Sequence, residues 1–115
     1  MCGICGVLNF TSATVAPNLL QGMTNVLRHR GPDEIGLYCD HQVGFGHTRL
    51  SIIDVSGGGQ PMHTEDGTLH ITFNGEIFNY LELRDELSKK GHRFATRSDT
   101  EVLLHLYQEE GEACV

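Results

Sequence analysis

The sequence contains no tryptophan, only three prolines and few basic residues for its acidic content. Its 115 residues include 8 Lys and Arg against 15 Asp and Glu, for a formal net charge of -7. Nucleic acids and anionic membranes attract basic surfaces, so this balance argues against either as the main partner. No segment reaches the roughly 20 apolar residues of a membrane span. The N-terminus also lacks the basic region and long apolar stretch of a signal peptide, so we expect a cytoplasmic protein.

The composition is that of a small folded domain. Hydrophobic residues make up 39% of the chain and charged residues 20%, which excludes a disordered tail. A chain of 115 residues forms at most one domain and leaves a large share of its surface exposed. The core is therefore expected to be marginal unless a partner covers part of it.

The chain has four cysteines, Cys2, Cys5, Cys39 and Cys114. Without an export signal, reduced thiols are the better interpretation than disulfides. The Cys2–Cys5 spacing leaves open a zinc protein or a thiol-redox protein, but a zinc site needs a second ligand pair, and none is visible. A redox pair at this spacing normally begins a helix, whereas this one begins an extended run. The seven histidines show no metal-ligand spacing either, so we expect no metal.

Periodicity predicts alternating strands and helices, and hence an α+β layered fold. The first strand, 2–10, is apolar enough to be buried on both faces. Two capping boxes are predicted, Asn79 with Glu82 and Ser98 with Glu101, and Gly91 is predicted to end a helix. The remaining expected elements are a helix from Pro17 to the basic turn 28–30, with an apolar stripe of Leu19, Leu20, Met23, Val26 and Leu27, strands 35–39, 42–48 and 68–73, and helices beginning near 79 and 98.

Cys2 directly follows the initiator methionine. Removal of Met1 would give one residue both a thiol and a free α-amine, whose ordinary pKa is about 7.7–8.0. Such an amine can act as the general base for its own thiol. Gly3 and Gly6 leave the neighbouring backbone open to a substrate. The competing interpretation is a buried structural cysteine.

Six motifs occur in a fixed order along nearly the whole chain: MCGICG, RHRGPD, GHTRLSIID, GGQPM, FNGEIFNY and SDTEVLL. In this order they resemble the class II glutamine amidotransferases. The chain is most similar to the N-terminal glutaminase domain of glutamine-hydrolysing asparagine synthetases. The resemblance implies hydrolysis of L-glutamine to glutamate and ammonia through a Cys2 thioester.

The same resemblance assigns the other residues of the glutamine pocket. Arg49 would bind the α-carboxylate, Asn74 and Gly75 would form the oxyanion hole, and Glu76 and Asp99 would face the α-ammonium group. Backbone groups would line the rest of the pocket, at Leu50, Ser51, Ile52 and Ile53.

Each of these residues also has a structural interpretation. Asn74-Gly75 is a common hairpin turn, Arg49 a surface arginine ending a strand, and Asp99 a partner for a helix dipole. The segment 28–33 is interpreted as a helix end and turn with a part in covering the pocket. The glycines after Ser56 are not assigned a nucleotide site, and His47 is assigned a structural role.

The family's fold is an α/β/β/α four-layer sandwich with antiparallel sheets, and its complete glutaminase domain is longer than this chain. We therefore expect residues 1–115 to be a partial domain, a fragment or truncated product, with the synthetase domain absent. ATP and magnesium are expected in that missing domain and no cofactor in this one. The missing synthetase domain would use the ammonia to make asparagine from aspartate. A homodimer is possible. The alternatives are a noncatalytic glutamine- or protein-binding module and an amidotransferase for another acceptor, such as a sugar acid.

Overall fold

The computed structural model describes residues 1–51 and 57–114 and confirms a mixed α+β architecture with antiparallel sheets. The chain divides into two compact units. The N-terminal unit contains Met1–Ser51, Gly59–Pro61 and Thr72–Asn74. The C-terminal unit contains Met62–Ile71 and the chain from Gly75 onward.

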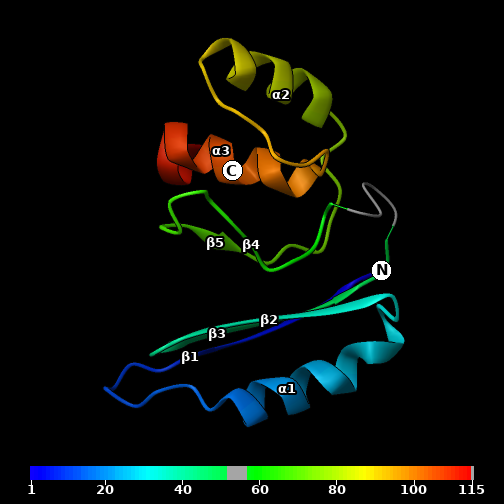
Figure 1. Cartoon of the computed structure of the whole chain (residues 1–115), viewed down its shortest axis with the longest axis vertical. Helices are drawn as coiled ribbons and strands as arrows, with labels where there is room; N and C mark the ends of the chain where they lie inside the picture. Colours follow the sequence, from blue (N-terminus) through cyan, green and yellow to red (C-terminus); the bar gives the residue numbers. More distant parts are fainter. Residues whose placement is uncertain (52–56, 115) are drawn as a thin grey trace. The chain divides into compact units, whose positions relative to one another are not determined.

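The N-terminal unit is a three-stranded antiparallel sheet covered on one face by a helix (Figure 1). The strands are β1 (Gly3–Leu8), β2 (Glu34–Asp40) and β3 (Val43–Arg49), in the order β1-β3-β2. The helix α1 (Pro17–Val26) has proline in its first turn and continues into the short η1 (Leu27–His29). The three predicted strands 2–10, 35–39 and 42–48, the predicted helix and its basic last turn are thus confirmed.

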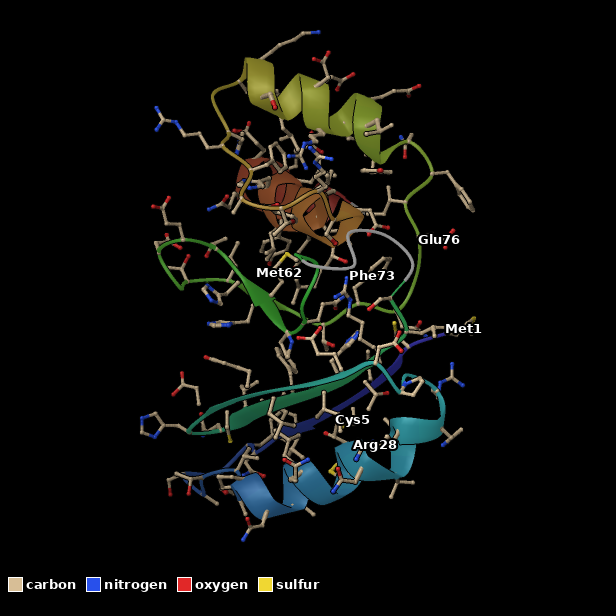
Figure 2. All side chains as sticks on the ribbon, turned by 45° about the vertical axis from the view of Figure 1, so that its right-hand side comes forward. Met1, Cys5, Arg28, Met62, Phe73 and Glu76 are labelled. Carbon is tan, nitrogen blue, oxygen red and sulfur yellow. The ribbon has the colours of Figure 1, made fainter. Side chains whose placement is uncertain are left out.

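Small residues let α1 lie close to the sheet. Cys5 of β1 points at the helix, with its Sγ 3.3 Å from Thr24 Oγ1 (Figure 2). A methyl group on Gly46 of β3 would overlap both of these atoms. Leu20 and Thr24 are the buried residues of α1. The predicted apolar stripe was wrong in part, because Leu19 and Val26 are 55% and 73% exposed.

The prediction that the first strand is buried on both faces was also wrong. Burial alternates along β1, and Ile4 and Leu8 are 45% and 57% exposed. Successive side chains of a strand point to opposite faces, and α1 covers only one of them. On the other face of this unit lies the segment 59–61, since a Cβ on Gly36 would overlap the Gln60 carbonyl.

The C-terminal unit consists of a short hairpin and two helices. The hairpin pairs β4 (Met62–His63) with β5 (His70–Ile71), and the helices are α2 (Tyr80–Lys89) and α3 (Asp99–Glu110), followed by η2 (Gly111–Cys114). Met62 of β4 is buried, and β4 contacts α3 (Figure 2). The core of the unit is apolar: Met62, Leu87, Val102 and Leu104.

The helix ends match the predicted capping signals only in part. Asn79 makes no side-chain cap bond, so its predicted capping box was wrong. Ser98 does cap α3 by accepting from the Thr100 N–H. The Glu101 carboxylate reaches back to the Ala95 and Thr96 N–H groups instead of to Ser98.

Two other local predictions had different outcomes. Gly91 follows α2 with a φ of 101°, the left-handed conformation predicted for a helix-ending glycine. The predicted strand 68–73 is paired only at His70–Ile71, and its partner β4 was not predicted. Two residue pairs give too little periodicity to be recognised in a sequence. Among the described helices, none combines the length and apolar character needed to cross a bilayer.

Two glycine substitutions test the packing of α1 on the sheet. Gly46→Ala should lower the free energy of unfolding by about 1–3 kcal/mol, because its methyl group overlaps Thr24 and Cys5. Gly22→Ala lies in α1 with nothing within 4 Å of the new methyl group. It should raise the free energy of unfolding by about 0.5–1 kcal/mol through helix propensity. Urea unfolding of both variants measures this, and equal stabilities would contradict the packing described.

Candidate active site

Cys2 lies at the start of β1, where the backbone of β3 ends beside it. Gly3 pairs with Thr48, so Cys2 and Arg49 each stand one residue beyond that pair and on the same face of the sheet. The Leu50 N–H donates to Cys2 Sγ at 3.3 Å, and the thiol lies 3.7 Å from the Leu50 carbonyl oxygen. The half-buried sulfur is therefore held between its own strand and Leu50.

The turn after η1 contacts the backbone of both Cys2 and the end of β3. Arg30 Nε donates to the Cys2 carbonyl oxygen at 3.0 Å. The Asp33 N–H donates to the Arg49 carbonyl oxygen at 3.0 Å, and the Asp33 carboxylate accepts from the Ser51 N–H at 2.8 Å. Sequence reasoning assigned 28–33 to a helix end and turn and missed these roles. An aspartate following Gly-Pro was the available signal, because a helix dipole alone has no use for a carboxylate at this end.

Gly31 allows the turn to reach the sheet. A Cβ at this position would overlap the Thr48 carbonyl group and the Arg49 nitrogen. Backbone approach this close requires glycine. The close approach of Gly31 therefore lets the Arg30 side chain reach the Cys2 carbonyl and the Asp33 carboxylate reach the Ser51 N–H, just beyond β3.

Arg49 is buried, with only 6% of its surface exposed. Its Nη1 lies 3.3 Å from Glu34 Oε2, across the strand pair of β2 with β3. The interpretation of Arg49 as a surface arginine was therefore wrong. Glu34, which sequence reasoning did not select, is the arginine's cross-strand carboxylate.

His47 is a buried neutral histidine on the same face as Arg49. It has no exposed surface, and its Nδ1 lies 3.0 Å from Thr72 Oγ1. Its Nε2 has no hydrogen-bond partner among the described residues. Burial, and secondarily the positive charge of Arg49, lower the pKa of His47 to about 4. The ring is therefore uncharged at neutral pH.

The segment leading to Asn74 belongs to the N-terminal unit as well. Gln60 Oε1 accepts from the Phe73 N–H at 2.6 Å, one residue before the half-buried Asn74. The hairpin interpretation of Asn74-Gly75 was wrong, because the chain continues into α2 rather than into a second strand.

The predicted contacts to an α-ammonium group come from the C-terminal unit. Glu76 is exposed, whereas Asp99 is 5% exposed in the first turn of α3. Asp99 Oδ2 accepts from the Ile77 N–H at 3.0 Å. The negative charge of Asp99 is thus favourable at the N-terminus of α3. Its carboxylate also fixes the backbone of Ile77, the residue after Glu76.

The structure places the predicted site residues in two groups. Cys2, Arg49, Leu50, Ser51 and Asn74 belong to the N-terminal unit, and Gly75, Glu76 and Asp99 to the C-terminal unit. Ile52 and Ile53 lie outside the described residues.

A Cys2–Cys5 redox pair does not fit the N-terminal unit. Cys2 contacts Leu50, while Cys5 contacts Thr24 of α1 on the opposite face of the sheet. Among residues 1–51 and 57–114, no group of three or more His, Cys, Asp or Glu side chains is arranged to hold a metal ion.

The acid titration of His47 tests its burial. Its imidazole resonance in NMR should titrate near pH 4, with His47→Gln providing the assignment. Because the folded pKa lies below the ordinary 6.5, this group stabilises the fold above pH 6.5, and that contribution is lost as pH falls toward 4. The loss amounts to about 3 kcal/mol. A midpoint near the ordinary value would show that the ring is not buried as described.

Comparison with known proteins agrees with the motif order. Glutamine-hydrolyzing asparagine synthetase 1 of Bacillus subtilis (strain 168) is 52% identical over 111 residues, 94% of this chain and 18% of the relative. The glutamine-hydrolyzing asparagine synthetase of Zea mays is 46% identical over 116 residues, 100% of this chain and 20% of the relative. The chain thus spans about a fifth of the length of these curated relatives. Residues 1–115 match the glutamine amidotransferase domain, and the chain belongs to that family.

Proposed function

We propose that this chain is the glutaminase part of a glutamine-hydrolysing asparagine synthetase, with Cys2 as the nucleophile. One observation carries the proposal. The Cys2 sulfur is held at the start of β1 by the Leu50 N–H, on the same face as the buried guanidinium of Arg49. A nucleophile beside a cation that can recognise a carboxylate is the arrangement that hydrolysis of an amino-acid side-chain amide requires.

The reaction begins once Met1 has been removed. Met1 is 73% exposed, so the N-terminal peptide bond is accessible. The freed amine of Cys2 takes the thiol proton, and the sulfur attacks the side-chain amide carbon of L-glutamine. The amine then gives the proton to the nitrogen of the tetrahedral adduct, the C–N bond breaks, and ammonia departs to leave a γ-glutamyl thioester on Cys2. Water, activated by the same amine, releases glutamate and restores the thiol.

The oxyanion formed in each step needs neutral donors. The Asn74 side-chain amide and the Gly75 N–H supply them in our proposal. Donors fixed in advance toward a developing charge lower the barrier without reorganisation, and loss of one typically costs about a hundredfold or more in rate.

The rest of the substrate is held by charged groups. Arg49 binds the α-carboxylate, while Glu76 and Asp99 face the α-ammonium group. The Arg49 Nη1 contact with Glu34 means that the substrate carboxylate shares or replaces that ion pair. The backbone of Leu50 and Ser51 lines the pocket.

The ammonia is used elsewhere in the parent protein. Residues 1–115 are in this proposal a partial glutaminase domain of the four-layer α/β/β/α sandwich. The parent is a cytoplasmic enzyme whose synthetase domain, with ATP and magnesium, makes asparagine from aspartate. The 18% to 20% coverage of the relatives leaves ample chain for such a domain.

Alkylation by a diazoketone analogue of glutamine tests the nucleophile. Intact mass spectrometry of the wild-type chain should show loss of Met1 and one adduct on Cys2. Cys2→Ser should abolish the adduct. Cys5→Ser is the matched control and should retain it, because Cys5 lies on the opposite face of β1 against α1. A retained methionine with an unreactive Cys2 would favour a noncatalytic module.

Substitution of Arg49 tests the carboxylate site. Arg49→Lys keeps the charge but loses the planar fork, so the concentration of analogue that gives half-maximal labelling should rise about tenfold or more. The maximal labelling rate should change less. Arg93→Lys, at an exposed position between α2 and α3, is the control and should leave both constants unchanged. Unaltered binding in Arg49→Lys would remove Arg49 from the pocket.

A further inference from the structure

Two side chains fix the segment that ends at Asn74. His47 Nδ1 and Thr72 Oγ1 are 3.0 Å apart, and Gln60 Oε1 accepts from the Phe73 N–H at 2.6 Å. All of these residues and Asn74 lie in the N-terminal unit. The two residues directly before Asn74 are therefore both held, Thr72 by the sheet and Phe73 by the segment 59–61.

His47 provides the rigid end of this attachment. It belongs to β3, the central strand, and pairs with Ile4 of β1 on one side and Gly36 of β2 on the other. It stands two residues before Arg49, and both side chains point to the face on which Cys2 lies. The hydrogen bond between His47 and Thr72 thus fixes the 72–74 segment to β3. The same strand carries Arg49 and ends beside Cys2.

The state of the ring suits a fixed neutral hydrogen bond. His47 is fully buried, and its low pKa keeps it uncharged. Its Nε2 lacks a partner among the described residues, and a buried polar atom without a partner typically costs about 1–3 kcal/mol. The Nδ1 contact with Thr72 is therefore the side-chain hydrogen bond that the described residues offer this buried ring.

We infer that His47 is a positioning residue for the oxyanion site: through Thr72 it holds the backbone that presents the Asn74 side-chain amide to the carbonyl attacked by Cys2. This inference rests on the proposed function, because it takes Cys2 as nucleophile and Asn74 as oxyanion donor. His47 does not exchange protons with the substrate. It sets where a donor stands when negative charge develops.

Paired substitutions at both ends of the hydrogen bond test the inference. Thr72→Val removes the hydroxyl group at nearly constant shape, whereas Thr72→Ser keeps it. His47→Asn keeps a polar atom near the Nδ1 position, whereas His47→Gln keeps one near Nε2. Each variant is treated with the diazoketone analogue, whose ketone oxygen takes the place of the amide oxygen, and separately with iodoacetamide, which needs no oxyanion site.

Thr72→Val and His47→Gln should lower the maximal rate of Cys2 labelling by the diazoketone about tenfold to a hundredfold, as expected for a displaced donor. The half-saturating concentration and the iodoacetamide rate should stay near wild type. Thr72→Ser and His47→Asn should restore most of the rate. A positioning role thus lowers the maximal labelling rate without weakening binding, and the conservative variants restore that rate. General loss of structure would not produce this combination.

Two other outcomes overturn the inference. If Thr72→Val labels at the wild-type rate, the hydrogen bond does not position the donor. If the variants lose diazoketone and iodoacetamide labelling together, and the conservative pair rescues neither, His47 is structural only. A wild-type chain that the diazoketone fails to label at Cys2 contradicts the proposed function itself, which is a separate and distinguishable result.

Discussion

The antiparallel pairing of β1 with β3 is the interaction on which the candidate site depends. Gly3 pairs with Thr48 and Ile4 with His47, so alternate residues of both strands share a face. Cys2, His47 and Arg49 consequently face one way, while Cys5, Gly46 and Thr48 face α1. A shift of this register by one residue would put Cys2 on the opposite face from His47 and Arg49.

Packing against α1 makes that register unambiguous. The helix approaches closely because Gly44 and Gly46 carry no side chains at the contact, and Cys5 and Thr24 are small. The shifted register would place the buried His47 and Arg49 side chains against the helix. Gly44 and Gly46 thus allow α1 to cover one face of the sheet, and this packing keeps His47 and Arg49 on the other face.

Several predictions from the sequence concerned local chemistry, and these were largely confirmed. Pro17 begins α1, Ser98 caps α3 and Gly91 follows α2 with positive φ. The antiparallel sheet of β2 and β3 also follows from alternation around the turn at His41. Such features depend on neighbouring residues, which a sequence displays directly.

The remaining features depend on contacts between distant residues. Glu34 beside Arg49, Asp33 beneath Ser51 and Thr72 against His47 are each brought together by the sheet. The spacing of these residues in the sequence does not predict a contact with a partner 15 to 25 positions away. The exposed Ile4 and Leu8 could not be predicted for a related reason, because an apolar sequence does not say whether a second layer covers it.

The proposal depends above all on the identity of the atom that attacks glutamine. Rapid acid quenching of the chain during incubation with glutamine, followed by tandem mass spectrometry of its N-terminal peptide, would identify that atom directly. We predict a γ-glutamyl group, the mass of glutamine less ammonia, on the sulfur of a Cys2 that has lost Met1. A γ-glutamyl group on any other residue, or glutamine hydrolysis by a chain that still carries Met1, would contradict this account.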